Sequence, residues 1–195
     1  MKNAIIVHGM PSQREDRIAK LLRIKASKSH WLGWLAKQLR RDGYDVWAPE
    51  MPKPYKPEWN VWVKEAEKTK IESETLLVGH SCGGGFWLRY LSEHPDLRVG
   101  KVVLVAPWID VPKRTAPDFF DFTLDKNIVK RTKGLTIFYS NNDMRAIQLS
   151  IDKIRAEVPG IEFREFPGYG HFTLFKMRTT KFPELLEECL KTSVK

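Results

Sequence analysis

The chain has 195 residues, of which 42% are apolar and 29% are charged. This balance fits one globular domain with a sizeable core and excludes a fibrous, disordered or disulfide-stapled chain. Lys and Arg number 33 against 24 Asp and Glu, a formal net charge of +9, which permits an acidic partner without requiring one.

The cysteine content and the lengths of the apolar runs indicate the cellular compartment in which we expect the protein. The two cysteines, Cys82 and Cys189, have no zinc-like spacing, so neither a disulfide framework nor a structural zinc site is predicted, and a reducing compartment is indicated. The longest apolar run near the N-terminus, Ala4–Val7, is too short for a signal peptide or a membrane span, and no later run is long enough. We therefore expect a cytoplasmic protein with no membrane contact.

Short apolar runs alternate with amphipathic segments from the first residues onward. Ala4–Val7 is a β-branched run that ends in His8-Gly9, which predicts a strand leading into a loop. Apolar residues then recur at helical spacing over Trp31–Leu39, before Asp42-Gly43 ends the helix. The strands expected along the chain are 4–7, 44–48, 76–78, 102–106, 135–139 and 161–166. The helices expected in the regular alternation are 31–39, 59–66, 84–92, 147–158 and 183–190.

This alternation predicts an α/β fold. Several strands are apolar on both faces, which is typical of a doubly wound, mainly parallel six-stranded sheet with helices on both faces. We expect a single domain over residues 1–195. Two segments interrupt the pattern: a basic insertion at about 11–29, and a segment rich in Pro, Asp and Phe at about 111–130. The second segment lies where α/β enzymes commonly carry a cap over the site.

The basic insertion combines cations with apolar positions. Ile18, Leu21 and Leu22 are spaced to share one face of a short helix, which we expect to be covered and to lie near the cleft. A solvated face explains the cations, and the alternative is that they attract an anionic substrate, a lipid or a nucleic acid. No nucleic-acid motif accompanies them, so no nucleic-acid partner is expected. The cations are Arg14, Arg17, Lys20, Arg23, Lys25 and Lys28.

The motif that carries chemistry is Gly79-His80-Ser81-Cys82-Gly83. It lies between an expected strand and an expected helix, which is the context of a G-x-S-x-G nucleophile elbow. The serine of such an elbow occupies a tight, strained turn, so the side chains two residues away must be minimal, as Gly79 and Gly83 are. Ser81 is therefore the candidate nucleophile.

A serine nucleophile needs a histidine base and an acid, in the chain order Ser, acid, His. His171 directly follows the last expected strand and is the candidate base. Asp143 follows the preceding strand and reaches the same edge of the sheet, which makes it the candidate acid. The alternatives for the acid are Asp110, Asp118, Asp121 and Asp125.

Two further sets of residues are candidates around the nucleophile. An oxyanion hole needs two backbone donors, and we expect the amides of Cys82 and Met10, since Pro11 has no N–H. Trp108 follows a strand and leads into the segment 111–130, so it is a candidate, with Phe119 and Phe120, to line an acyl or aromatic pocket. Core packing is the alternative interpretation of the three aromatic residues.

Together these motifs resemble those of the α/β-hydrolase superfamily, specifically the small serine hydrolases of the retinoblastoma-binding protein 9 or YdeN-like family. The resemblance covers most of the chain. It implies Ser81 as nucleophile, Asp143 as acid and His171 as base, in a compact hydrolase with no metal or organic cofactor. Two features depart from the family: the basic segment is longer, and Ser140-Asn141-Asn142 stands where acidic residues are more usual. The resemblance rests on residues 31–35, 51–54, 59, 62, 79–83, 104–108 and 170–172.

The predicted function is hydrolysis of a small carboxylic ester, or of an amide or thioester, through an acyl-enzyme on Ser81. The expected partner is thus a small-molecule acyl substrate. The alternative is a noncatalytic binding protein that keeps the hydrolase scaffold and holds an acidic partner through its basic segment. Acyl transfer to an acceptor other than water would leave the same sequence pattern.

Overall fold

The central layer of the computed structural model, which describes residues 2–191, is a six-stranded sheet. The strand order is β2-β1-β3-β4-β5-β6, and every neighbouring pair is parallel. This confirms the predicted α/β class and the parallel sheet. The strands are β1 Asn3–Val7, β2 Asp45–Trp47, β3 Leu76–His80, β4 Val102–Val105, β5 Leu135–Tyr139 and β6 Glu162–Glu165.

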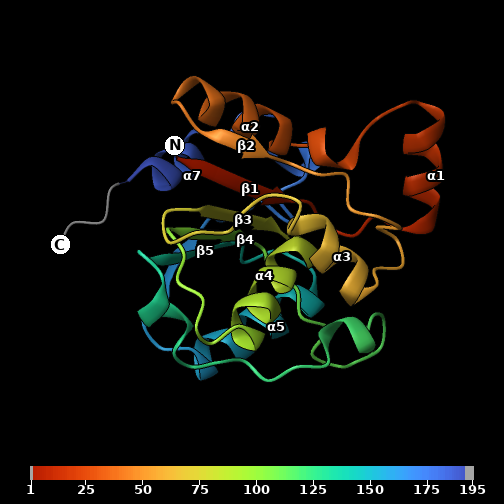
Figure 1. The fold of residues 1–195 in the computed structure, drawn as a ribbon. Helices are drawn as coiled ribbons and strands as arrows, with labels where there is room; N and C mark the ends of the chain where they lie inside the picture. Colours follow the sequence, from red (N-terminus) through yellow and green to blue (C-terminus); the bar gives the residue numbers. More distant parts are fainter. Residues whose placement is uncertain (1, 192–195) are drawn as a thin grey trace.

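Helices cover both faces of the sheet (Figure 1). Helices α2 and α7 contact each other on one face, and α3, α4 and α5 lie on the other. None of the helices within the described residues is long and apolar enough to cross a membrane. The α-helices are α1 Gln13–Leu21, α2 Leu32–Arg41, α3 Trp59–Ala66, α4 Cys82–Glu93, α5 Arg145–Glu157, α6 Leu174–Met177 and α7 Pro183–Leu190. The short 3₁₀ helices are η1 Ala26–Lys28, η2 Asp118–Phe120 and η3 Ile128–Arg131.

The core lies between the central strands and the helices on either side. Strands β1, β3, β4 and β5 are almost wholly buried, because each has sheet neighbours at both edges and helices over both faces. The edge strand β6 is only partly buried. This gradient explains why the inner strands read as continuous apolar runs in the sequence.

Helix α4 begins two residues earlier than expected, at Cys82 rather than Gly84. Glycines 83–85 have low helix propensity, yet here they are the residues that let α4 lie against the sheet edge and its loops. A Cβ atom built on Gly83 would lie 2.3 Å from the Val7 carbonyl oxygen, and one on Gly85 would lie 1.9 Å from that of Trp108. Close tertiary packing therefore overrides the local preference.

The segment 111–130 packs beside α4. The guanidinium of Arg89 donates to the carbonyl oxygens of Asp118 and Phe119, each at 2.8 Å. The carboxylate of Asp110 accepts from the amides of Thr115 and Ala116, each at 2.8 Å. These bonds hold the segment against the helix that follows the elbow.

The basic insertion contains the expected short helix, α1, which projects at one side of the molecule (Figure 1). Its first turn is closed by a capping box, in which Ser12 Oγ accepts from the Glu15 amide and the Glu15 carboxylate accepts from the Ser12 amide. The expectation that Ile18, Leu21 and Leu22 would be covered is wrong, because all three are exposed. The helix turns its Asp16 side inward instead.

A buried carboxylate joins the last helix to the sheet. Glu188 of α7 accepts from Thr136 Oγ1 at 2.9 Å and from Arg164 Nη1 at 3.0 Å, and it pairs with Lys101 and Lys191. Burial alone would raise the pKa of Glu188, but the hydrogen bonds from Lys101, Lys191 and Thr136 outweigh burial and lower its pKa to about 2. The ionised form thus stabilises the fold.

We predict that Glu188→Gln lowers the free energy of unfolding by about 3 kcal/mol at neutral pH, because it removes the buried counter-charge of the partly exposed cations Lys101, Arg164 and Lys191. Exposed Glu187 provides the matched control, and Glu187→Gln should change stability by less than about 0.5 kcal/mol. Because the folded pKa of Glu188 lies below its ordinary value of 4.5, its contribution is present above pH 4.5 and is lost as the pH falls toward 2. Urea unfolding at several pH values measures both effects, and equal stability of the two variants at pH 7 would refute the assignment.

Candidate active site

Ser81 occupies the sharp turn between β3 and α4. Its φ of +53° and ψ of −119° place it in a region that residues with a side chain rarely adopt. The Ser81 amide donates to the Val105 carbonyl at 2.9 Å, and its carbonyl accepts from the amide of Trp108 at 3.0 Å. These bonds to the β4 end hold the strained turn and aim the side chain above the sheet edge.

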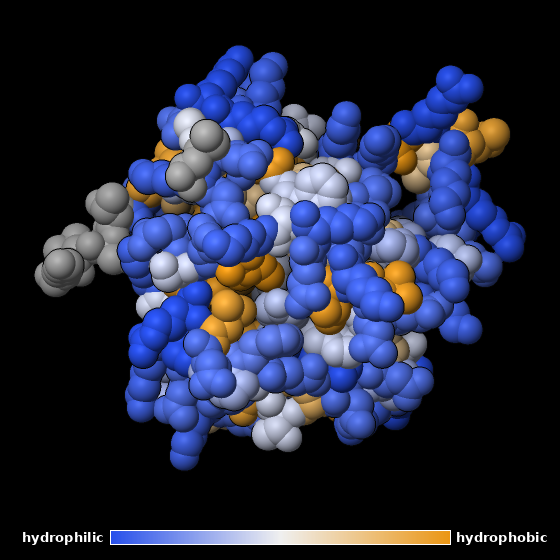
Figure 2. Space-filling view, viewed as in Figure 1, coloured by the Kyte–Doolittle hydropathy of each residue, from blue (hydrophilic) through white to orange (hydrophobic). Residues whose placement is uncertain are grey.

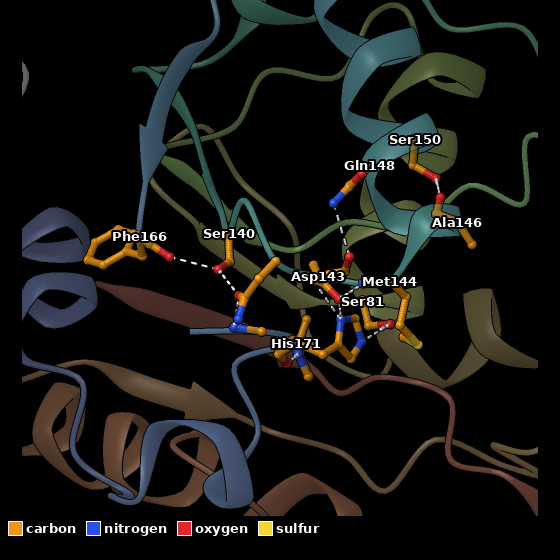
Figure 3. A network of polar contacts seen from close by, with 12 residues as sticks. Ser81, Ser140, Asp143, Met144, Ala146, Gln148, Ser150, Phe166 and His171 are labelled. Atoms are coloured by element: carbon orange, nitrogen blue, oxygen red, sulfur yellow. Dashed lines mark hydrogen bonds and ion pairs between the residues drawn. The ribbon is translucent and has the colours of Figure 1, made fainter. Parts of the chain in front are cut away.

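A line of hydrogen bonds runs from Ser81 through His171 to Asp143 (Figure 3). His171 Nε2 lies 2.9 Å from Ser81 Oγ, and His171 Nδ1 lies 3.0 and 3.1 Å from the two carboxylate oxygens of Asp143. The Asp143 carboxylate is 1% exposed. The three residues are contributed by the ends of β3, β5 and β6, so parallel strands bring them to one edge of the sheet.

The other acids considered from the sequence lie elsewhere. Asp110 uses its carboxylate to hold the amides of residues 115 and 116. Asp121 pairs with Lys113, and Asp125 pairs with Arg131. Among the candidates, Asp143 is the acid that the structure brings to His171.

The loops that carry Asp143 and His171 are tied to each other by neutral side chains. Asn142 Oδ1 accepts from the Gly170 amide at 2.8 Å, and Asn141 Oδ1 accepts from the Gly168 amide at 3.2 Å. This explains the departure noted in the sequence, because an amide oxygen accepts these bonds without adding charge beside Asp143. Sequence reasoning singled out neither asparagine as functional, and their only signal was their place directly before the acid.

His80 supports the base from behind. Its Nε2 lies 3.0 Å from the carbonyl oxygen of His171, and the two rings are 5.0 Å apart between centroids. Burial, followed by the proximity of His171 and His30, lowers the pKa of His80 well below its ordinary value. The neutral ring therefore donates from Nε2 to that carbonyl and helps to position the His171 loop.

The loop after β1 passes directly over the elbow. A Cβ atom on Gly9 would lie 3.0 Å from Ser81 Cβ. The buried His8 ring fixes the loop: its Nδ1 lies 2.7 Å from the Gly9 carbonyl oxygen, and its Nε2 accepts from the Met51 amide at 2.9 Å. Burial also lowers the pKa of His8, which fits a neutral ring with its proton on Nδ1.

Each of the two expected oxyanion donors directly follows one residue of this contact in the chain. Met10 follows the loop glycine and lines the cavity described next, and Cys82 is the first residue of α4. Within residues 2–191, neither backbone amide donates a hydrogen bond to a protein acceptor. Both N–H groups are thus available to a ligand.

A cavity of about 1070 Å³ opens over Ser81 and His171. Trp108 lines it, as expected. Phe119 and Phe120 do not, and the expectation that they would is corrected: both are buried in an aromatic cluster, where Phe119 lies 5.1 Å from Trp62 between ring centroids. The cluster forms because the segment 111–130 turns onto α4 and away from the cleft.

The basic insertion, rather than the segment 111–130, borders the cavity. From 111–130 only Thr115 reaches it. The insertion supplies one whole side, contributing Pro11, Glu15, Asp16, Ala19, Lys20, Arg23, Ile24, Lys25, Ala26 and Ser29.

The acids and cations around the cavity are not equivalent. Asp16 pairs with Lys20 at 2.7 Å, and the Glu50 carboxylate accepts from the amides of residues 26 and 27. Arg23 and Lys25 have no ion pair or hydrogen bond from their side chains in the described part of the chain. The cavity lining therefore carries charges of both signs, with Lys20, Arg23, Lys25 and Lys53 against Glu15, Asp16 and Glu50.

The α/β hydrolases have a serine on a strand-turn-helix elbow at the carboxyl edge of a doubly wound parallel sheet. In them the serine contacts a histidine, and the histidine contacts an acid, as Ser81, His171 and Asp143 do here. No group of three or more His, Cys, Asp or Glu side chains in residues 2–191 is placed to hold a metal ion.

The comparison with known proteins places the chain within this class. The model of the family "Serine hydrolase" matches residues 24–186, and the chain belongs to this family and is a hydrolase. It is 28% identical to the protein YdeN of Bacillus subtilis (strain 168) over 157 residues, which cover 75% of this chain and 80% of YdeN. It is 23% identical to Serine hydrolase RBBP9 of Rattus norvegicus over 161 residues, covering 80% of this chain and 82% of that protein. The crystal structure of the B. subtilis ydeN gene product superposes with a TM-score of 0.77 over 96% of both chains.

We predict that Gly83→Ala destabilises the protein by about 3 kcal/mol or more, because the added methyl group would meet the backbone carbonyl oxygens of Val7 and His8 at 2.3 and 2.6 Å. As a control on the same turn, Cys82→Ala removes volume and should cost only about 1 kcal/mol. Thermal unfolding of both variants tests the close approach, and a Gly83→Ala protein as stable as wild type would contradict it.

Proposed function

We propose that the protein cleaves a small carboxylic ester through a covalent acyl-enzyme on Ser81. The observation that carries the proposal is the unbroken line of hydrogen bonds from the Asp143 carboxylate through His171 to Ser81 Oγ, at the floor of an open cavity. A buried carboxylate at Nδ1 selects the tautomer in which Nε2 carries the lone pair. That lone pair faces the serine hydroxyl.

In the proposed reaction, His171 takes the proton of Ser81 as Oγ attacks the ester carbonyl carbon. The tetrahedral intermediate collapses, the C–O bond to the leaving alcohol breaks, and His171 returns the proton to that alcohol. Water then enters, gives a proton to His171 and attacks the acyl carbon. The second tetrahedral intermediate collapses, the bond from the acyl carbon to Ser81 Oγ breaks, and His171 returns its proton to Oγ as the carboxylic acid leaves. Asp143 stabilises the imidazolium formed in each half of the reaction.

The negative oxygen of both intermediates would lie between the amides of Met10 and Cys82. Two features support this assignment: neither N–H group has an acceptor among residues 2–191, and the loop that carries Met10 approaches Ser81 closely at Gly9. The neutral His8 ring holds the Gly9 carbonyl and so helps to orient the next amide. Preorganised backbone donors of this kind typically contribute a factor of about 10² to 10³ each.

Amides and thioesters would enter the same chemistry. We propose an ester as the substrate because an alcohol is a better leaving group than an amine, and its departure therefore depends less on protonation by His171. The unpaired side chains of Arg23 and Lys25 at the cavity rim favour an acyl or alcohol group that carries negative charge.

We predict that a fluorophosphonate probe labels Ser81 and that mass spectrometry maps the adduct to the peptide containing it. Ser81→Ala should abolish labelling and lower ester turnover by about 10⁴-fold or more, because the attacking oxygen is gone. Ser150→Ala serves as a control, since Ser150 Oγ is a buried hydroxyl that bonds the Ala146 carbonyl and Ile109 amide away from His171. An unlabelled but folded wild-type protein would instead favour the noncatalytic binding protein.

We predict that Asp143→Asn lowers turnover by about 10⁴-fold, because an amide at this position favours the wrong tautomer of His171. Asp110→Asn is the matched comparison, since Asp110 is also a buried acid and its carboxylate binds the loop amides of Thr115 and Ala116. It should lower stability with little loss of turnover per folded molecule. Steady-state kinetics with an aryl ester compare the turnover numbers of the two variants. If Asp110→Asn lost turnover and Asp143→Asn kept it, the assignment of the acid would be wrong.

A further inference from the structure

The outer face of α1 exposes aliphatic side chains to solvent. Ile18 is 46% exposed and Leu21 is 82% exposed, and just beyond the helix Leu22 and Ile24 are 60% and 53% exposed. Figure 2 shows apolar atoms on this projecting segment among hydrophilic ones. Four neighbouring aliphatic residues in water are unfavourable unless a partner covers them.

Cations share this face. At 3.6 residues per turn, Arg14 and Arg17 lie on the same side of the helix as Ile18 and Leu21, opposite the buried Asp16. Both arginines are exposed, and neither has an ion pair or hydrogen bond from its side chain among residues 2–191. The carboxylate of Asp16 pairs with Lys20, whereas that of Glu15 accepts from the Ser12 amide and keeps its charge, so the cations of α1 outnumber its acids by three to two.

The inner face of the same segment borders the candidate active site. Ala19 and Ile24 line the cavity, with Arg23 and Lys25 at its rim. A surface that contacted the outer face of α1 would therefore lie next to the cavity mouth.

A second exposed apolar element begins at this mouth. The amide of Leu174, the first residue of α6, donates to His30 Nδ1 at 3.0 Å, and His30 lines the cavity. The next residue, Phe175, is 85% exposed. Apolar side chains thus stand beside the cavity on two elements that are far apart in sequence.

We propose that α1 and the residues that follow it, 13–25, form a docking surface for an anionic phospholipid membrane, on which the protein rests peripherally with its cavity mouth toward the lipid. Exposed aliphatic residues mixed with unpaired cations are the pattern of helices that lie in a membrane interface. An anionic lipid surface supplies an apolar phase that covers the aliphatic side chains, and negative charge that complements Arg14 and Arg17.

A nucleic acid would complement only the cations and would leave the aliphatic residues exposed. The sequence alone predicted no membrane contact, because no apolar run is long enough to span a membrane, and it assigned the apolar positions of this helix to the interior. The surface does not depend on the hydrolytic chemistry, so it can be tested on an inactive protein.

The test is co-sedimentation of the full chain with vesicles of pure phosphatidylcholine and with vesicles that also contain about one third phosphatidylglycerol. Wild type and Ser81→Ala should bind the anionic vesicles equally and bind the neutral ones weakly. Arg14→Gln with Arg17→Gln should weaken binding to the anionic vesicles by about fivefold per charge. Ile18→Ser with Leu21→Ser should weaken binding to the same vesicles by about tenfold or more.

The matched control is Lys126→Gln with Lys130→Gln, which changes the net charge equally at two exposed lysines before β5 that do not line the cavity. It should retain most of the wild-type binding. The proposal is overturned if wild type does not bind anionic vesicles, or if the control loses as much as the α1 variants. It is also overturned if Leu21 instead mediates self-association in sedimentation velocity without vesicle binding. Failure of Ser81 to react with a fluorophosphonate would leave the vesicle result unaffected.

Discussion

The strained turn at Ser81 is the constraint on which the rest of the molecule depends. A serine with φ of +53° costs on the order of 1 to 3 kcal/mol, and it is held because α4 lies almost in contact with the loop after β1. That approach requires Gly83, where a side chain would strike the carbonyl oxygen of Val7. The same approach brings the Gly9 loop over Ser81, where a Cβ atom on Gly9 would lie 3.0 Å from Ser81 Cβ. The packing of α4 and the geometry of the Ser81 turn are therefore one requirement.

The remaining groups are located by the sheet and by bonds between its loops. Parallel strands end at one edge, so Asp143 and His171 need only short loops to reach the elbow. Short loops alone would leave rotational freedom, which Asn142 removes by binding the amide of Gly170, and His80 removes by binding the carbonyl of His171. These supporting groups are neutral. A charged group in either place would alter the proton affinity of the imidazole, whereas amide and neutral imidazole contacts orient it.

The order of strands and helices was predictable because burial on both faces produces apolar runs. The contact of His171 with Ser81 and Asp143 was predictable because each of the three residues follows such a run. The predictions that were wrong concerned the direction in which a segment turns after it leaves the sheet. Phe119 and Phe120 were placed at the pocket because their segment follows the β4 loop, but a sequence does not show on which side of α4 that segment turns. The short helix α6 was missed because four residues produce no helical period.

Helix α1 is a second case in which the sequence did not show the direction of a side chain. Helical spacing correctly grouped Ile18 and Leu21 on one face, and the usual preference for burial then assigned that face to the interior. In the structure Asp16 faces inward, where Lys20 compensates its charge and its carboxylate borders the cavity. One turn of helix thus presents a polar face to the cleft and an apolar, cationic face to the outside. A fold that needed α1 only for stability would have buried its aliphatic residues. The reversed orientation therefore points to a contact that the isolated chain does not make.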